Sequence, residues 1–369
     1  MEYTIIIVAT LSVESIFLST YLTNTSNELK EDTKDNTKDS NRDNNINRPK
    51  KPKALLDFKF INNSSDFLTQ MNIIVSLLNI LSKNSSNYKY NNALREFCTK
   101  YCLNMKLVNE VLSLNNQLRT LCEDIFKLNK NKWSANLEIP SSKSQLLLFQ
   151  IILSGLIDNI ARKKIIYDNS GNEVDNKQNK KEHKKKIIYE CNENNVECQI
   201  HTDSMLSKEL PNYVAYKEII QDSNKANLVT VMAIQPEWIF NLGGELVNYS
   251  FEKLNLNLEP LYSNKDDIIY CFLNMKYGYK SWEINNVKVE MTETNSNNVI
   301  YRWFARLLLE GKIIDGFKAY TKFLDPKPNV LTNPVCILPK VTSFINLFKL
   351  NKISTKKELL SKITTNKNK

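Results

Sequence analysis

Apolar residues recur at steps of three and four between residues 66 and 127, and this spacing predicts amphipathic helices. The first helix carries Phe67, Met71, Ile74, Leu77, Leu78 and Leu81. The pattern returns from Asn92 to Tyr101 and again from Lys106 to Leu128. The apolar face of this last helix consists of Leu107, Val111, Leu114, Leu118, Leu121 and Ile125. A further helix begins at Ser141 or Ser142, either of which can cap it. This part of the chain is therefore predicted to be a helical bundle.

Between residues 197 and 239 the sequence pattern changes to short runs of β-forming residues. One run lies around Cys198, and two others cover residues 213–220 and 228–234. Their β-branched and aromatic side chains are typical of strands. Pro236 then stands where a helix can start, because a proline in the first turn gives up no helix hydrogen bond. The stretch predicts three strands followed by a helix. Two further strands are predicted at 268–275 and 282–291, and a helical tail from Trp303.

Tyr3 to Leu18 form an apolar run at the start of the chain, interrupted by Thr, Ser and Glu14. The run is short for a membrane span, which needs about 20 apolar residues. A signal peptide carries positive charge before its apolar stretch, whereas Glu2 is acidic. A buried helix and a secretory signal both remain open as interpretations.

Two polar segments interrupt the apolar pattern. Residues 22–53 mix charged side chains with Asn and Ser and end in the basic run Arg48 to Lys53, and residues 168–186 hold six lysines. Such compositions bury too little apolar surface to offset the entropy of ordering, so both are predicted to be disordered insertions. The lysine-rich segment could bind phosphates non-specifically, because binding releases their counterions. A solvated loop is the simpler interpretation.

Lys and Arg outnumber Asp and Glu by 50 to 40, which gives the 369-residue chain a net charge of +10. This balance favours an anionic partner, although a composition rich in Lys and Asn explains it equally. Only seven glycines argue against a glycine-clustered nucleotide fold. Seven cysteines without a Cys-x-x-Cys pair, together with two histidines, argue against zinc and favour reduced thiols inside a cell.

Four short motifs between residues 200 and 239 carry a family resemblance. They are Ile200-His201-Thr202-Asp203-Ser204, Pro211 to Glu218, Ser223-Asn224-Lys225 and Ile234 to Ile239. They resemble the OB-fold region of DEAH/RHA-type RNA helicases, which reads Ile-His-Pro-Ser-Ser, Pro-x-[aromatic]-Val-x-Tyr-x-Glu, Thr-Thr-Lys and Ile-Asp-Pro-x-Trp-Leu. The chain departs from the first and third motifs, where Thr-Asp replaces Pro-Ser and Ser-Asn replaces Thr-Thr.

Other stretches extend the resemblance over most of the chain outside the polar segments. Residues 3–17 are similar to the helicase-associated segment Pro-Tyr-Val-Ile-x-Ile-Val-Ala-x-Leu-Ser-Val-x-x-x-Phe, which implies a start within a domain. Residues 104–111 match a turn between two ratchet helices, and residues 155–164 match the lead into the OB-fold. Residues 302–311 resemble His-Phe-Ala-Arg-Phe-Leu-Leu-Glu-Gly of a nucleolar branch that acts on pre-ribosomal small-subunit RNA.

The resemblance implies an α+β chain with a helical ratchet-like bundle, an OB-type β-barrel and a mixed C-terminal extension. The implied divisions are an apolar helix of the helicase-associated domain (1–21), a disordered polar insertion (22–53), the helical ratchet-like domain (54–166), a basic disordered insertion (167–186), the OB-fold (187–262) and the C-terminal extension with a helical tail (263–369).

The sequence contains neither of two motifs that a helicase motor needs. Such a motor needs Gly-x-x-x-x-Gly-Lys-[Ser/Thr] and Asp-Glu-x-His. Gly311 to Lys318 has the glycine spacing but places Phe317 where lysine is required. We find no catalytic and no metal-binding residue, and the resemblance assigns ATP and magnesium to two RecA-like domains outside this chain. Whether the chain itself is an enzyme is left open.

The resemblance implies a role in gripping single-stranded RNA, either pre-rRNA or a snoRNA, for those RecA-like domains. It implies pre-ribosomal proteins as neighbours and the nucleolus of the nucleus as the location, away from membranes. Lys225 matches the lysine of Thr-Thr-Lys and is the leading phosphate contact. The other candidate contacts are Ser223 and Asn224 beside it, and Arg162, Lys163 and Lys164, which are expected to leave the preceding helix at the barrel's edge. A free-standing RNA-binding or scaffold protein without ATPase activity is the alternative.

Overall fold

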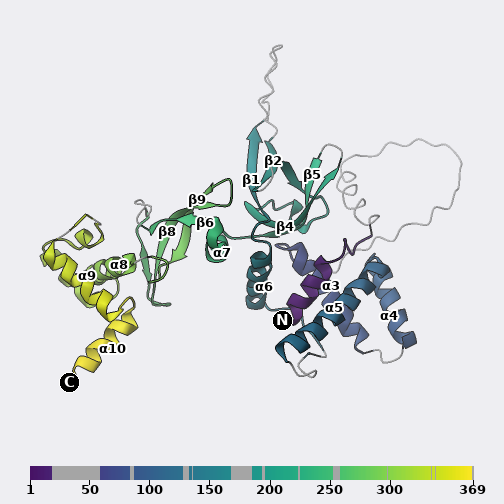
Figure 1. Cartoon of the computed structure of the whole chain (residues 1–369), viewed down its shortest axis with the longest axis horizontal. Coiled ribbons are helices and arrows are strands. Elements are labelled where there is room, and N and C mark those ends of the chain that lie inside the picture. The colour runs from purple at the N-terminus through teal and green to yellow at the C-terminus, as the bar shows by residue number, and fades with distance from the viewer. Residues whose placement is uncertain are drawn as a thin grey trace, which may run out of the picture. The chain divides into compact units, whose positions relative to one another are not determined.

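The computed structural model describes residues 1–18, 59–83, 87–127, 133–134, 136–167, 185–192, 196–222, 225–251, 258–296, 298–333, 335–336 and 338–367. The chain forms two compact units, Met1–Ile234 and Gln235–Lys369. It runs from purple to teal through the first unit and from green to yellow through the second (Figure 1). The predicted insertion at 22–53 lies outside the described residues. Helices and strands occur in both units, so the predicted α+β class is confirmed.

Five helices form the described helical part of the first unit. They are α1 (Glu2–Leu11), α3 (Asp66–Leu81), α4 (Asn87–Lys100), α5 (Met105–Phe126) and α6 (Ser142–Gly155). The α1 helix packs against α3 and α5 and buries Ile5, Ile6 and Ile7, which agrees with the buried-helix interpretation of the N-terminal run. The α3 helix is buried on nearly all sides. It begins at Ser65, whose side chain accepts a hydrogen bond from the Leu68 amide.

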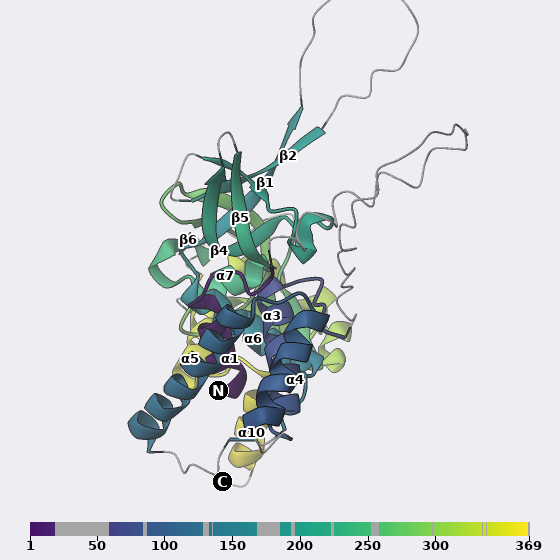
Figure 2. The same ribbon diagram turned by 90° about the vertical axis from the view of Figure 1, so that its right-hand side faces the viewer.

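The apolar face of α5 differs from the predicted one. The buried positions are Val108, Val111, Leu112 and Asn115, which lie in the first half of the helix. Leu121 and Ile125 are 53% and 71% exposed. The reason is length: at about 1.5 Å per residue, a 22-residue helix extends well past the 10-residue α1 that covers it. Figure 2 shows the far end of α5 extending beyond α1.

The first unit continues into a closed five-stranded barrel with strand order β1-β2-β3-β5-β4. Its strands are β1 (Ile160–Tyr167), β2 (Lys185–Cys191), β3 (Glu197–Ile200), β4 (Tyr213–Asp222) and β5 (Lys225–Ala233). Neighbouring strands are antiparallel except for β3 and β5, which run parallel. Alternate residues point inward, among them Ala161, Tyr189, Cys198 and Leu228, and fill the barrel with side chains.

The barrel's limits differ from the predicted ones. Its first strand begins at Ile160, inside the predicted helical domain, because the apolar run after α6 pairs with β2 and β4. Tyr167, Lys185 and Lys186, which the prediction assigned to the basic insertion, are paired strand residues. Residues 168–184 of that insertion lie outside the described residues. The three strands predicted within residues 197–239 are confirmed as β3, β4 and β5.

The second unit contains a four-stranded sheet built around β8 (Ile268–Tyr277). β6 (Val247–Tyr249), β7 (Leu261–Ser263) and β9 (Trp282–Glu290) all pair with it. Buried and less buried side chains alternate along β8, as expected for a sheet with one covered face. The preceding α7 (Pro236–Leu242) starts at Pro236 as predicted. The predicted OB-fold range of 187–262 thus includes β6 and part of β7, which belong to this second sheet.

Helices complete the second unit. They are α8 (Val299–Leu309), the 3-10 helices η6 (Asp315–Ala319), η7 (Thr321–Phe323) and η8 (Pro328–Thr332), α9 (Pro339–Asn351) and α10 (Lys356–Lys367). Asp267, just before β8, fastens the start of α10. Its carboxylate accepts hydrogen bonds from the amides of Lys356 and Lys357 at 2.7 and 3.0 Å, and from the Tyr262 hydroxyl at 2.5 Å.

Candidate nucleic-acid interface

The three predicted cations at 162–164 lie within β1, not at the end of the preceding helix as expected. Arg162 pairs with Glu190 on the neighbouring strand, its Nη2 lying 3.2 Å from Oε2. The Nζ of Lys163 donates to the carbonyl of Leu210 at 2.8 Å. Both side chains are partly buried. Two of the three cations therefore hold the barrel together, and only Lys164 is exposed.

Lys225 opens β5 beside its backbone partner Asp222 in the β4–β5 hairpin. Its side chain is exposed, and neither Lys225 nor Lys164 has an ion pair or side-chain hydrogen bond within the part of the chain that the structure describes. Ser223 and Asn224, the other two candidates, lie outside the described residues. Lys164 and Lys225 are thus the two candidate cations that remain available to a phosphate group.

Lys225 belongs to an outward-facing row of charges that crosses the barrel strands. Arg162 pairs in register with Glu190, and Glu190 with Glu197. Cys198 pairs with Ala226 in the parallel β3–β5 ladder, so Glu197 and Lys225, one residue earlier in each strand, lie side by side. Each residue of this row has a neighbour in its own strand that belongs to the barrel core: Ala161, Tyr189, Cys198 or Ala226. Because side chains alternate along a strand, the row itself faces outward. The prediction missed Glu190 and Glu197, which lower the positive potential around Lys225.

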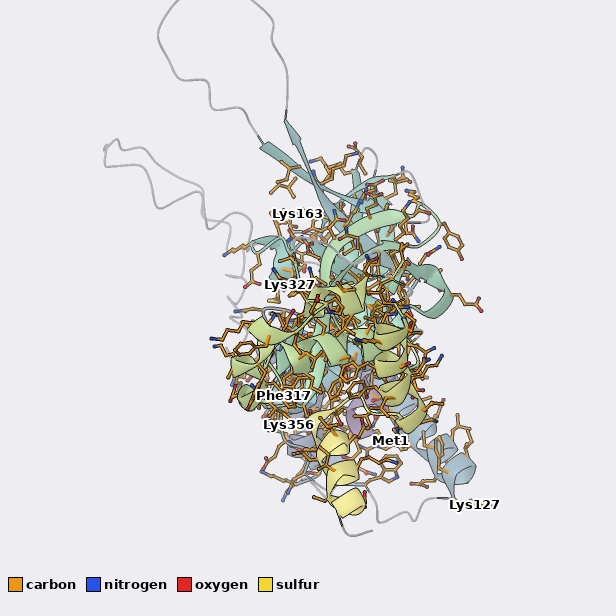
Figure 3. All side chains as sticks on the ribbon, turned by 90° about the vertical axis from the view of Figure 1, so that its left-hand side faces the viewer. Met1, Lys127, Lys163, Phe317, Lys327 and Lys356 are labelled. Atoms are coloured by element: carbon orange, nitrogen blue, oxygen red, sulfur yellow. The ribbon has the colours of Figure 1, made fainter. Side chains whose placement is uncertain are left out.

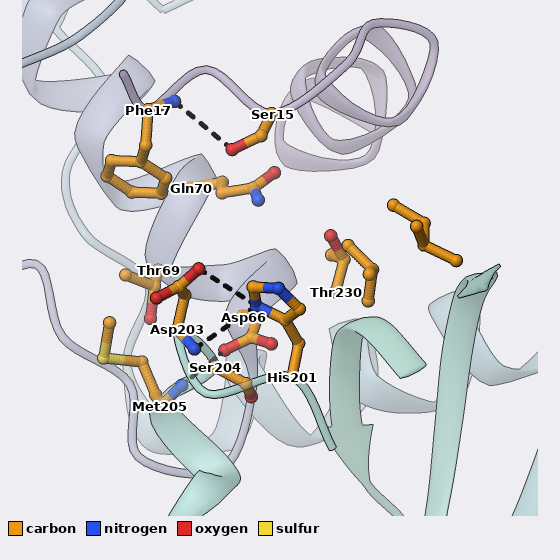
Figure 4. A pocket seen from close by; sticks show the side chains of 12 residues that line it. Ser15, Phe17, Asp66, Thr69, Gln70, His201, Asp203, Ser204, Met205 and Thr230 are labelled. Carbon is orange, nitrogen blue, oxygen red and sulfur yellow. Dashed lines mark hydrogen bonds and ion pairs between the residues drawn. The ribbon is translucent and has the colours of Figure 1, made fainter. Parts of the chain in front are cut away.

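A cavity of about 220 Å³ lies in the first unit, between the start of α3 and the barrel. Its wall includes Asp66, Gln70, His201, Asp203, Met205 and Thr230 (Figure 4). His201 follows β3, and its Nδ1 lies 3.0 Å from the carboxylate of Asp203. The wall thus carries two carboxylates and a single imidazole, and Lys164 and Lys225 do not line it.

Asp66 fastens α3 to the barrel from inside this wall. Its two carboxylate oxygens accept hydrogen bonds from the amides of Met205 and Val231, each at 2.9 Å. Burial raises the pKa of this carboxyl, while the hydrogen bonds from Val231, Ser204 and Met205 act in the opposite direction. Thr230, just before Val231, has a φ of +51°, which is unusual for a β-branched residue. The local strain accompanies the turn of the Val231 amide toward Asp66.

The family-like stretch 302–311 serves the packing of α8. Phe304, Ala305 and Leu308 are buried. The Arg306 guanidinium lies 2.6 Å from Glu259 and 2.7 Å from Glu310, and Glu310 also binds Lys312 at 2.8 Å. These carboxylates occupy Arg306, and Arg302 donates to the carbonyl of Asn333 at 3.1 Å, so both cations of this motif have partners within the fold.

Within the described ranges, no three His, Cys, Asp or Glu side chains gather in a way that could hold a metal ion. The described helices also include none with both the length and the apolar character needed to cross a membrane.

A closed five-stranded barrel with exposed cations on its outer surface defines an OB-type protein, a class that binds nucleic acids. Comparison with protein families agrees. Residues 148–246 match the oligonucleotide/oligosaccharide-binding (OB)-fold family, and residues 1–70 match the ratchet-like helicase associated domain (HA2). The chain therefore contains regions that match the HA2 ratchet and the OB-fold, the pair of domains found in the C-terminal region of DEAH-box RNA helicases.

Individual relatives give the same result. The chain is 26% identical over 260 residues to the putative ATP-dependent RNA helicase rha-2 of Caenorhabditis elegans, covering 70% of this chain and 21% of that protein. It is 24% identical to the probable ATP-dependent RNA helicases kurz of Drosophila melanogaster and DHX37 of Homo sapiens. These matches cover 69% and 74% of this chain and 20% and 22% of those proteins. The chain thus spans about a fifth of the length of these curated relatives.

Proposed function

We propose that this chain grips single-stranded RNA while an ATP-driven motor moves along the strand. The observation that carries the proposal is the closed barrel β1-β2-β3-β5-β4, whose residues match the OB-fold family next to an HA2 match. OB-folds bind single strands through a basic surface that follows the sugar–phosphate backbone. Lys164 and Lys225 are the proposed phosphate contacts, and Ser223 and Asn224 are proposed to add hydrogen bonds beside Lys225.

The motor in this proposal consists of RecA-like domains acting in cis or in trans, and ATP and magnesium bind there. The relatives' names, which describe ATP-dependent RNA helicases, support this division of labour. The chain's own sequence carries no phosphate-binding loop of the motor type. We therefore expect the purified chain to hydrolyse no ATP, with or without RNA. RNA-stimulated turnover that survives a contaminant control would contradict this.

The RNA in this proposal is pre-rRNA of the small ribosomal subunit or an associated snoRNA. Pre-ribosomal proteins are the proposed neighbours, and the nucleolus is the proposed location. The support is the resemblance of residues 302–311 to the nucleolar branch. Crosslinking of the tagged chain to RNA in cells, followed by sequencing, tests this directly. We expect enrichment of small-subunit precursor RNA, and an even spread over messenger RNA would refute the assignment.

Binding in vitro tests the grip itself. We expect the full chain to bind a fluorescent single-stranded RNA at low salt and to prefer it over a duplex of the same sequence. Phosphate contacts lose affinity with rising salt because counterions are no longer released as favourably. Equal affinity for duplex and single strand would indicate a general polycation effect and would contradict an OB-type grip.

A further inference from the structure

Three large aromatic side chains are exposed on one short segment of the second unit. Phe317, Tyr320 and Phe323, defined here as the aromatic strip, are 39%, 65% and 75% exposed. Phe317 lies on the 3-10 helix η6, Phe323 lies on η7, and Tyr320 joins the two. Isolated exposed apolar side chains are ordinary, but a contiguous group on a folded surface indicates a binding site.

The strip presents its rings on one face. The amide of Phe317 donates to the carbonyl of Ile314 at 3.1 Å, and those of Tyr320 and Phe323 each donate to the preceding member of the strip at 2.9 Å. Such a chain of bonds has three residues per turn, so the three side chains align at a rise of about 6 Å from one to the next. An exposed ring face can hold a flat ring of a ligand at about 3.5 Å, the usual distance between carbon atoms in contact.

The backbone under the strip is anchored while the rings stay uncovered. Gly311, with a φ of +72°, lets the segment approach closely, because a Cβ there would lie 2.5 Å from the Lys318 nitrogen. The Thr321 hydroxyl donates to the carbonyl of Leu309 at 3.0 Å. Among the described residues, nothing lies within 4 Å of the position of a Cβ on Gly316, so the segment is open at this point.

Lysines alternate with these rings. Lys318 and Lys322 lie within the strip, and Lys327 follows it; Figure 3 labels Phe317 and Lys327. The Nζ of Lys322 is 5.4 Å from the centre of the Phe323 ring. Among the described residues none forms an ion pair with these three lysines, although Asp315 and Asp325 lie at either end of the segment.

We propose that the aromatic strip is a second RNA contact, on which bases of a single strand stack while Lys318, Lys322 and Lys327 face its phosphates. Exposed rings interleaved with cations are what single-strand binding requires, because every base offers a flat face. A protein partner would use the apolar area without needing the lysines. The proposal rests on the proposed function for the kind of strand, and it does not depend on the barrel cations.

The test compares the full chain with the double variant Tyr320→Ala/Phe323→Ala on two fluorescent strands. One is a short oligouridylate, and the other is an abasic strand with the same phosphates. We expect the double variant to bind the oligouridylate at least about tenfold more weakly, as the loss of stacked bases predicts. The two proteins should bind the abasic strand equally.

Three further variants make the result specific. Tyr279→Ala removes a ring that is 74% exposed in the same unit and should leave binding unchanged. Tyr320→Leu/Phe323→Leu keeps apolar area without ring faces and should bind as weakly as the alanine pair. Tyr320→Trp should retain binding, and its added fluorescence should be quenched by the oligouridylate and not by the abasic strand.

The outcomes separate this proposal from the barrel site. Changes at Lys164 or Lys225 should weaken binding to both strands, whereas changes in the strip should affect only the strand with bases. Wild-type affinity of the alanine or leucine pair for the oligouridylate would overturn the stacking site and leave the strip as a surface for a protein. Failure of the wild-type chain to bind either strand would overturn both proposals.

Discussion

Each of the two units contains a buried carboxylate that holds a distant segment by two backbone amides. In the first unit, Asp66 binds the amides of Met205 and Val231. In the second, Asp267 binds those of Lys356 and Lys357. Burial raises the pKa of Asp66. At Asp267, burial is outweighed by the bonds from Tyr262, Lys357 and Lys356 and by the charge of Lys357, and the pKa is lowered. The same bonding to two backbone amides thus accompanies opposite pKa shifts, because the other groups around each carboxylate differ.

Surroundings also decide what the cations of the barrel do. Arg162 and Lys163 are tied to Glu190 and to the Leu210 carbonyl, whereas Lys164 in the same strand is exposed. Of three consecutive cations in the sequence, therefore, one is exposed on the barrel surface.

The largest expected effect is the loss of stability of the first unit in Asp66→Ala. The change leaves two amides without an acceptor, and Val231 is fully buried. Each buried unpaired donor costs about 1–3 kcal/mol, so we expect the unfolding free energy to fall by roughly 2–6 kcal/mol. Urea unfolding read by pulsed hydrogen–deuterium exchange reports the peptides of each unit separately. Equal protection of β5 in wild type and variant would show that Asp66 does not fasten α3 to the barrel.

A smaller effect is expected for the matched change in the second unit, Asp267→Ala. The amides of Lys356 and Lys357 open α10, and Lys357 is exposed, so water replaces the lost acceptor. Loss of a helix-capping side chain costs about 1 kcal/mol. The same exchange measurement should show earlier exchange of α10 and an unchanged first unit. A loss as large as that of Asp66→Ala would remove the difference drawn between the two carboxylates.

The two carboxylates should also respond to pH in opposite directions. The pKa of Asp66 is raised above its usual 3.8, so its contribution to stability falls as pH rises from about that value through the raised pKa. The pKa of Asp267 is lowered, so its contribution is present above about 3.8 and is lost as pH falls further. Urea midpoints of wild type and of each Asp→Asn variant, measured across acidic pH, give these contributions by difference. Slopes of the same sign would contradict the assignment.

Hydrophobic periodicity predicted the helices, β-forming runs predicted the three barrel strands, and the family-like motifs predicted the OB-type fold. The buried face of α5 was placed wrongly, and the residues of the first barrel strand were assigned to the helical domain, because neither the length of a covering helix nor the partner of an apolar run is local information. The pairing of Arg162 with Glu190 could not be predicted for the same reason, since strand register joins residues 28 positions apart. The three-residue spacing of Phe317, Tyr320 and Phe323 was visible in the sequence, but their exposure was not.

A modest effect on affinity is expected for Glu197→Gln. Glu197 lies beside Lys225 in the outward row of charges, and its negative charge opposes an approaching phosphate. Removing it should strengthen RNA binding by about two- to fivefold at low salt, with less gain at high salt, because surface charges interact weakly and are screened. Fluorescence anisotropy at two salt concentrations measures this gain. Unchanged or weaker binding would place the RNA path away from this row.

The salt dependence of RNA binding tests the central claim most directly. The logarithm of affinity is measured against the logarithm of salt concentration for the wild type, Lys164→Ala, Lys225→Ala and the control Lys106→Ala, which changes an exposed lysine of α5. One lost phosphate contact on a single strand lowers the magnitude of the slope by about 0.7. We predict that decrease for Lys164→Ala and for Lys225→Ala, and the wild-type line for Lys106→Ala. Four coincident lines would contradict the claim that the barrel holds RNA through these two lysines.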